Sequence, residues 1–104
     1  MIRKALELTD CPGRGELLAQ VDGIDYVDGP VTMLNLRVDR ARPAAIGVPS
    51  PVPISPSVLD EDGEVIGGLL LWLDDAGYID CLEYWWVTDK MPTKLPSPDR
   101  LAAS

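Results

Sequence analysis

The stretch Glu64–Val87, EVIGGLLLWLDDAGYIDCLEYWWV, decides the fold of this chain. It consists of an apolar run, a polar turn at Asp74–Gly77 and a second apolar run. Two runs rich in aliphatic and aromatic residues, joined by a short loop that contains Asp and Gly, are typical of a β-hairpin. Five of the six aromatic residues lie in this stretch, so the hairpin is expected to occupy the middle of the molecule.

Two short segments before the hairpin are expected to be helical. Ile2–Leu8 is rich in helix formers, although its alternation of apolar and polar residues would also suit an edge strand. Glu16–Val21 is predicted to form about two helical turns, with its acid near the positive end of the helix. The residues of this second helix that we expect to be buried are Leu17, Leu18 and Val21.

Two strands are predicted between these helices and the hairpin. Ile24–Asp28 ends at a Gly-Pro turn, and Val31–Val38 alternates between apolar and polar residues. One face of the second strand is predicted to carry Leu34, Leu36 and Val38. Such half-buried strands are typical of antiparallel sheets. The sequence therefore predicts one α+β domain over residues 1–104: a mainly antiparallel sheet of about four to five strands, with one or two short N-terminal helices.

The segment Ala41–Pro56 carries five prolines. Proline cannot donate a ladder hydrogen bond, so this segment is expected to be extended, polyproline-like or an edge strand. Its interleaved Val and Ile residues are expected to face the core of this protein. The alternative is that another protein recognises the prolines. The Asp-Gly pair that follows predicts a turn that joins Pro56–Leu59 to the strand beginning at Val65.

The net charge of −8 is unevenly placed. From Pro43 to Asp89 there are nine acids and no Lys or Arg, whereas the remainder of the chain is nearly neutral. Binding to nucleic acid needs clustered basic residues, so the composition argues against nucleic acid and against anionic membranes as partners. No apolar run approaches the length of a membrane span, and no signal peptide is evident. A cytoplasmic location is expected, and any charged partner is expected to be basic.

Histidine is absent, and Cys11 and Cys81 are the only cysteines. The absence of histidine removes the usual Ser-His and Cys-His nucleophiles and most zinc ligand sets. A cytoplasmic chain would keep both thiols reduced. We therefore predict no catalytic residue, metal site or cofactor, and the composition favours a protein without enzymatic activity.

Glu83 is the most informative candidate site residue, because acids are depleted from the interiors of strands. On simple alternation its face also carries Ile79 and Trp85. Three arrangements would accommodate its carboxylate. It pairs with Arg37 or Arg3, or it faces solvent beside Trp85, or it lines a pocket with Trp72 and Trp85. Because the chain has no phenylalanine, the tryptophans are otherwise expected to fill the core.

The C-terminal half contains the pattern LWLDDxGYIxxLEYxWxTDxxPTxLPxP within Gly67–Pro98. In this pattern the chain resembles small acidic proteins of unassigned function found in actinobacterial genomes. The resemblance implies an actinobacterial source, and it supplies no activity.

Two functions fit these observations. The first is a non-enzymatic, acidic protein-interaction domain of the immunity-protein or inhibitor type. Its partner is another protein, a basic one if it is charged, or a second copy of this chain. The second is a small-molecule-binding domain that uses an aromatic and carboxylate pocket around Glu83, with Trp72 and Trp85 as the other binding residues.

Overall fold

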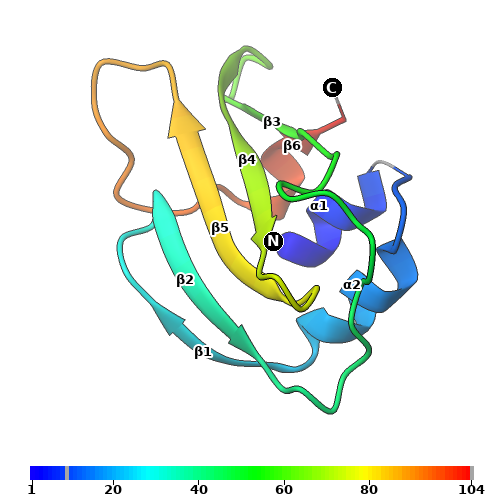
Figure 1. Cartoon of the computed structure of the whole chain (residues 1–104). Coiled ribbons are helices and arrows are strands. Elements are labelled where there is room, and N and C mark those ends of the chain that lie inside the picture. The colour runs from blue at the N-terminus through cyan, green and yellow to red at the C-terminus, as the bar shows by residue number, and fades with distance from the viewer. Residues whose placement is uncertain (9, 104) are drawn as a thin grey trace.

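The computed structural model describes residues 1–8 and 10–103, which form one sheet with two short helices on one of its faces (Figure 1). In these residues the sheet has six strands in the order β1-β2-β5-β4-β3-β6, and every neighbouring pair is antiparallel. The elements are α1 (Ile2–Leu8), α2 (Arg14–Val21), β1 (Ile24–Asp28), β2 (Met33–Val38), β3 (Ser57–Leu59), β4 (Val65–Leu73), β5 (Ile79–Trp86), the 3-10 turn η1 (Pro98–Arg100) and β6 (Leu101–Ala102). The predicted α+β class is confirmed.

The hairpin β4–β5 forms the centre of the sheet, as predicted from Glu64–Val87. Its turn is held by Asp74, whose Oδ1 accepts hydrogen bonds of 3.0 Å from the backbone N–H groups of Ala76 and Tyr78. Gly77 has φ of +86°, and a Cβ there would lie 2.8 Å from the carbonyl oxygen of Ala45. The turn therefore needs glycine both for its left-handed backbone and for the close approach of another segment.

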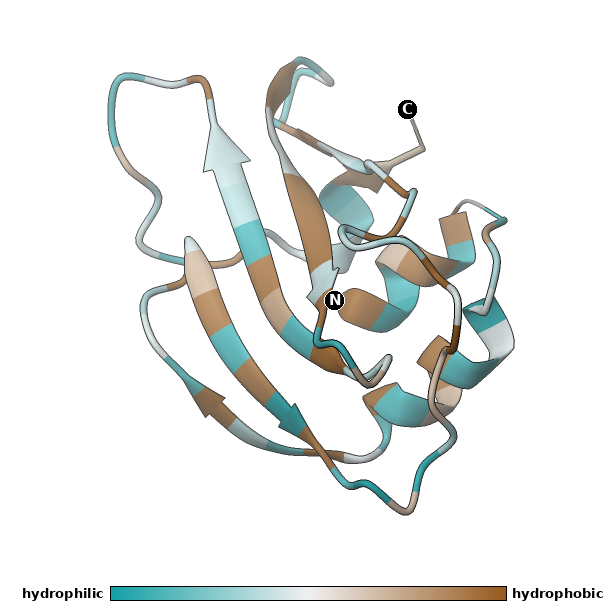
Figure 2. Ribbon diagram, viewed as in Figure 1, coloured by the Kyte–Doolittle hydropathy of each residue, from teal (hydrophilic) through white to brown (hydrophobic). Residues whose placement is uncertain are grey.

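The hydrophobic core lies between the sheet and the two helices. Figure 2 shows apolar and polar residues alternating along β2 and a continuous apolar run in β4. The buried residues include Leu6 of α1, Leu17 of α2, and the inward-facing residues Leu36, Val38, Leu69, Leu71, Leu82 and Tyr84 of the sheet. In α2, Leu17 is buried as predicted and Leu18 and Val21 are half-buried against the core.

One polar residue joins the core, and the sequence did not indicate it. The Gln20 side chain of α2 is 0% exposed. Its Nε2 donates to the carbonyl oxygens of Pro43 and Gly77, both at 2.9 Å, and its Oε1 accepts from the Ile79 N–H at 2.8 Å. Gln20 therefore connects α2 to the proline-rich segment and to the start of β5, with all of these buried groups satisfied.

A β-bulge in the hairpin changes the alternation expected for β5. Trp72 pairs with Cys81, whereas Leu73 pairs with Ile79, so that Asp80 is an extra residue on β5. Because of this insertion, Ile79 points into the core, where it is 1% exposed. The prediction that Ile79 shares a face with Glu83 is therefore wrong.

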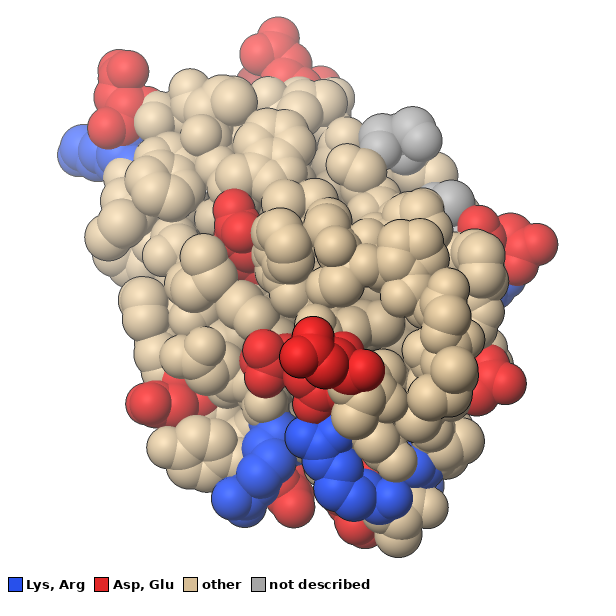
Figure 3. Space-filling view, viewed as in Figure 1, with Lys and Arg blue, Asp and Glu red and all other residues tan. Residues whose placement is uncertain are grey.

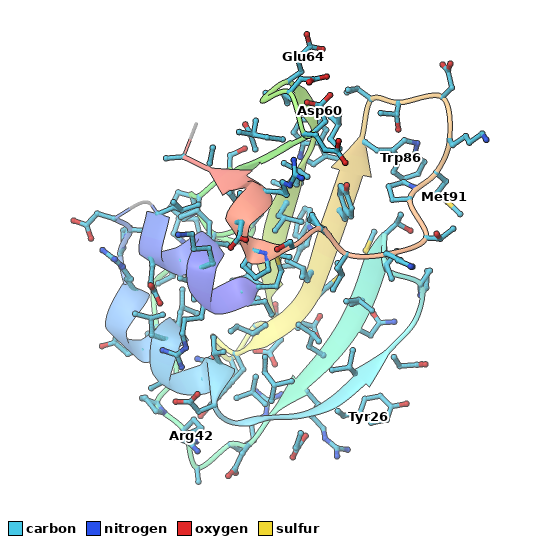
Figure 4. All side chains as sticks on the ribbon, turned by 180° about the vertical axis from the view of Figure 1, so that it is seen from behind. Tyr26, Arg42, Asp60, Glu64, Trp86 and Met91 are labelled. Carbon is cyan, nitrogen blue, oxygen red and sulfur yellow. The ribbon has the colours of Figure 1, made fainter. Side chains whose placement is uncertain are left out.

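The proline-rich segment runs beside β4 in an extended path. The Val52 N–H donates to Leu71 O at 2.8 Å, and the Leu69 N–H donates to Pro56 O at 3.1 Å. Val52 and Ile54 are buried, which confirms the expectation that they face the core. The acidic turn that follows joins β3 to β4, with Leu59 paired to Val65 as predicted, and Figure 4 shows Asp60 and Glu64 at the rim of the molecule.

Candidate functional site

The sheet face opposite the helices is the candidate site. Neither helix covers it, and the C-terminal tail passes behind β5 in Figure 1. Three neighbouring strands, β2, β5 and β4, contribute the central side chains of this surface, which we call the open face: Met33, Leu70, Trp72, Cys81, Glu83 and Trp85. Figure 3 shows that the upper part of this side of the molecule is mostly uncharged, and that acidic and basic side chains gather below the centre of the view and at its edges.

Glu83 lies at the centre of the open face. The strand register places it opposite Met33 of β2 and opposite Leu70 of β4. Its Oε1 accepts a hydrogen bond of 3.1 Å from Trp72 Nε1. Its carboxylate is thus half-buried among apolar side chains, with an indole N–H as a hydrogen-bond donor.

Neither of the arginine pairings considered for Glu83 is present. Arg37 Nε lies 2.9 Å from Asp25 Oδ1, and an Arg3 terminal nitrogen lies 2.7 Å from Asp22 Oδ1. None of the four ion pairs formed by residues 1–8 and 10–103 contains Glu83. The physical reason is the register of β2, which places Met33 rather than Arg37 across from Glu83.

Trp85 lies on the same face as Glu83, two residues along β5, and its indole covers Gly68 of β4. A Cβ at Gly68 would overlap the Trp85 ring and would lie 2.7 Å from its Nε1. Gly68 therefore allows the indole to lie against the backbone of β4. At Gly67, the preceding residue of β4, a Cβ would overlap the carbonyl oxygen of Trp85, so both glycines of this strand allow a close approach of β5.

The structure brings together Trp72, Glu83 and Trp85, the three residues that the sequence indicated for binding. It places both tryptophans differently from the expectation that they fill the core, because they are half-buried on the open face. The core is filled instead by Leu, Ile and Val residues and by Tyr84, whose pKa is raised by burial. The arrangement suits binding by stacking and by a carboxylate, and it contains no nucleophile with an activating base.

Both cysteines are free thiols, and Cys81 belongs to the open face. Its Sγ lies 3.1 Å from Met33 Sδ. Burial raises the pKa of Cys81, and the charges of Asp80 and Glu83 raise it further. A thiol in this environment is a poor nucleophile, because it carries little thiolate near neutral pH.

A second feature, which the sequence did not indicate, lies on the helix side of the sheet. A pocket of about 280 Å³ is lined by apolar residues of β1, β2, β5, the two helices and the tail. The sequence gives little sign of this pocket, because leucines and valines in this pattern are also typical of an ordinary hydrophobic core.

Within the described part of the chain, no group of three or more His, Cys, Asp or Glu residues is placed to hold a metal ion.

No helix among the described residues is both long and apolar enough to span a membrane. No family model, curated protein or solved structure matches this chain.

Proposed function

We propose that this chain is a non-enzymatic protein-interaction domain, of the immunity-protein or inhibitor type, that binds another protein through the open face. The observation that carries the proposal is the environment of Glu83. This carboxylate sits among Trp72, Trp85, Leu70 and Met33 on a face without a helix. A broad apolar face with a polar group at its centre is the usual composition of a protein-binding surface.

The chemistry of this centre favours a Lys or Arg side chain from the partner. A cation at Glu83 would pair with the carboxylate and would also lie near the faces of two indoles, which attract cations. Tryptophan and arginine are the residues most often found where binding energy is concentrated. The net charge of −8 would speed the approach of a basic partner at low salt.

A capture experiment with matched variants tests this proposal. The tagged protein is incubated with a lysate of its source organism at low salt, and bound proteins are identified by mass spectrometry. We expect one partner to be retained by the wild type and lost with Glu83→Gln and with Trp85→Ala. Glu64→Gln is the matched control, because Glu64 is an exposed acid in the β3–β4 turn and its loss changes the net charge equally.

Two results would count against the proposal. One is that no protein is retained at low salt, and the other is that Glu83→Gln retains the partner as well as Glu64→Gln does. Circular dichroism of each variant checks that a loss of binding is not a loss of fold.

The other possible occupants of the open face give distinct results. A small amine would change tryptophan fluorescence on titration of the purified protein, and Glu83→Gln would abolish that change. A second copy of the chain would appear in light scattering as a dimer at tens of micromolar. The proposal includes a cytoplasmic location, which the two free thiols support.

A further inference from the structure

Strand β1 forms one edge of the sheet. In the part of the chain that the structure describes, β1 pairs with β2 on one side and with no strand on the other. Figure 4 shows no ribbon beyond β1 on that side, and it shows Tyr26 projecting outward from the strand. Tyr26 and Val27 are 51% and 56% exposed. The β1 edge therefore offers backbone N–H and C=O groups to which an extended chain can pair.

The apolar pocket borders this edge. Ile24 and Val27 of β1 form one wall, and Leu34 and Leu36 of β2 form the floor with Leu82. The remaining lining residues come from the N-terminus, the helices and the C-terminal tail: Met1, Ile2, Val21 and Leu95. The pocket is present because the helices lie over the β4 side of the sheet and leave the inner side of β1 partly uncovered (Figure 4).

The size and lining of the pocket indicate what it holds. Its volume of about 280 Å³ is at or below the range of pockets that enclose whole small molecules, which is roughly 300–1,000 Å³. Every lining residue is apolar, so the part of a ligand that enters is hydrocarbon. Aliphatic side chains carried by a peptide at the edge fit both the size and the position.

Among the described residues, the opposite side of the same edge carries one carboxylate, that of Asp28, without an ion pair. The register pairs Val27 with buried Leu36 and Asp28 with exposed Asn35, so these two β1 residues point to opposite faces of the sheet. Asp25 is paired with Arg37, whereas none of the ion pairs of the described residues contains Asp28. An added strand would therefore meet hydrocarbon on one face and an unpaired carboxylate on the other.

In at least one register, a second copy of β1 would bring like charges together at this edge. In an antiparallel pair centred between Tyr26 and Val27, Asp25 of one copy would lie across from Asp28 of the other. Like charges directly opposite each other destabilise a strand pair. Residues that alternate between aliphatic and basic side chains would match both faces.

We infer that the β1 edge and its pocket bind an extended, basic peptide segment of a partner protein by strand addition. The peptide backbone pairs with β1, its aliphatic side chains enter the pocket and its basic side chains face Asp28. Backbone pairing supplies affinity in this mode, and the pocket supplies selectivity for alternate side chains. The pocket lies on the face of the sheet opposite the open face, and Asp28 is an edge residue outside the six that define the open face, so this site does not depend on the function proposed for it.

The test uses an acetylated seven-residue peptide in which lysine alternates with leucine or valine. Titration into the nitrogen-15-labelled full chain is followed by NMR. We expect saturable shifts of the amide signals of residues 24–28. Val27→Lys, which places a charge at the exposed rim of the pocket, is expected to weaken binding about tenfold or more. Asp28→Asn is expected to weaken it a few-fold and to reduce its salt dependence.

Three controls separate strand addition from other binding. A peptide of the same composition with its lysines in one block, and the alternating peptide with N-methylated backbone amides, are both expected to bind at least about tenfold more weakly. Trp85→Ala, on the other face of the sheet, is expected to bind like the wild type. Because Trp85→Ala alters only the open face, it also distinguishes a loss of peptide binding at the β1 edge from a loss of partner binding at the open face.

The inference is overturned if the amides of residues 24–28 do not shift at millimolar peptide, or if the N-methylated peptide binds equally well. Shifts confined to the methyl groups of the pocket would make it a site for small apolar molecules instead. Concentration-dependent shifts of the β1 amides without peptide, with a dimer in light scattering, would identify a second copy as the occupant.

Discussion

The two faces of the central hairpin are both apolar, but only one of them is closed by other elements. On the inner face, Leu69 and Leu71 of β4 and Leu82 and Tyr84 of β5 are buried under the helices and the proline-rich segment. On the open face, Leu70, Trp72, Glu83 and Trp85 are half-buried, with no helix above them. Neighbouring residues of one strand are therefore placed differently: one set is buried and stabilises the fold, and the other forms the open face.

Leu71 and Leu70 give the most direct comparison of the two faces, because they are the same residue type at adjacent positions of β4. Leu71 is buried in the core and Leu70 is half-buried on the open face. We expect Leu71→Ala to lower the free energy of unfolding by about 3–4 kcal/mol, through lost burial and a cavity. Leu70→Ala is expected to cost less than about 1.5 kcal/mol, because water reaches its site.

Urea unfolding followed by circular dichroism measures both variants, and equal slopes for the two transitions would justify comparing their midpoints. Equal losses of stability for the two substitutions would contradict the division of the sheet into a closed face and an open one.

Loss of the buried Gln20 side chain, which closes the inner face, is expected to have the next largest effect on stability. Gln20→Ala removes three hydrogen bonds and leaves the Ile79 N–H and the carbonyl oxygens of Pro43 and Gly77 without their partner. We expect the free energy of unfolding to fall by about 2–3 kcal/mol, because such buried groups are costly when unsatisfied. Glu16→Ala is the control, since Glu16 is an exposed residue of the same helix.

A loss below about 0.5 kcal/mol for Gln20→Ala in the same urea experiment would mean that water replaces the side chain without penalty. In that case Gln20 would not be what connects α2 to the hairpin.

The fold was largely predictable from local patterns. The hairpin in Glu64–Val87 has a turn with strong sequence signals, and Ile24–Asp28 matches β1 at both ends. The bulge at Asp80 was not predictable, because an extra residue leaves the apolar pattern of β5 almost unchanged while it moves Ile79 to the other face. Gln20 was missed because its burial depends on carbonyl groups distant in sequence.

The candidate site was predictable in part. The rarity of acids in strand interiors indicated Glu83, and alternation along the second strand of the hairpin indicated Trp85 beside it. The ion pair with Arg37 that was considered for Glu83 depended on the register between β2 and β5, which the sequence does not specify. That register places Met33 across from Glu83, and Arg37 pairs with Asp25 of β1. Which face the helices cover depends on long-range packing. Residue pattern alone therefore did not place the tryptophans on the open face.

The turn of the hairpin provides a smaller, pH-dependent effect. Burial alone would raise the pKa of Asp74, but the hydrogen bonds from Arg40 and from the Tyr78 and Ala76 N–H groups outweigh it and hold this pKa below its usual value of 3.8. A carboxyl with a lower pKa in the folded state stabilises the fold above its unfolded pKa, and this contribution disappears as the pH falls through the folded pKa.

Asp74→Asn is therefore expected to lower the free energy of unfolding by about 1 kcal/mol at pH 7; the effect is modest because Arg40 is largely exposed. The difference between the two proteins is expected to shrink as the pH falls below about 4. Unfolding curves of both proteins between pH 7 and pH 3 measure the difference. Asp75→Asn is the control from the same turn, and it is expected to change stability by less than about 0.5 kcal/mol. A difference for Asp74→Asn that stays constant over this range would refute the proposed role of its charge.

The smallest expected effect concerns the electrostatics of the open face. The charge of Glu83 contributes to the raised pKa of Cys81, after burial and the charge of Asp80. Glu83→Gln should therefore lower the pKa of Cys81 and increase its thiolate fraction at pH 8, and alkylation by iodoacetamide should become about two- to threefold faster. Cys11 provides an internal control, because its raised pKa arises from burial and from Asp10, opposed by Arg14, without a contribution from Glu83.

Mass spectrometry of the two cysteine peptides gives both rates in one experiment. If both cysteines accelerate equally, the substitution has loosened the fold, and if neither changes, the Glu83 charge does not act on the open face as its position implies.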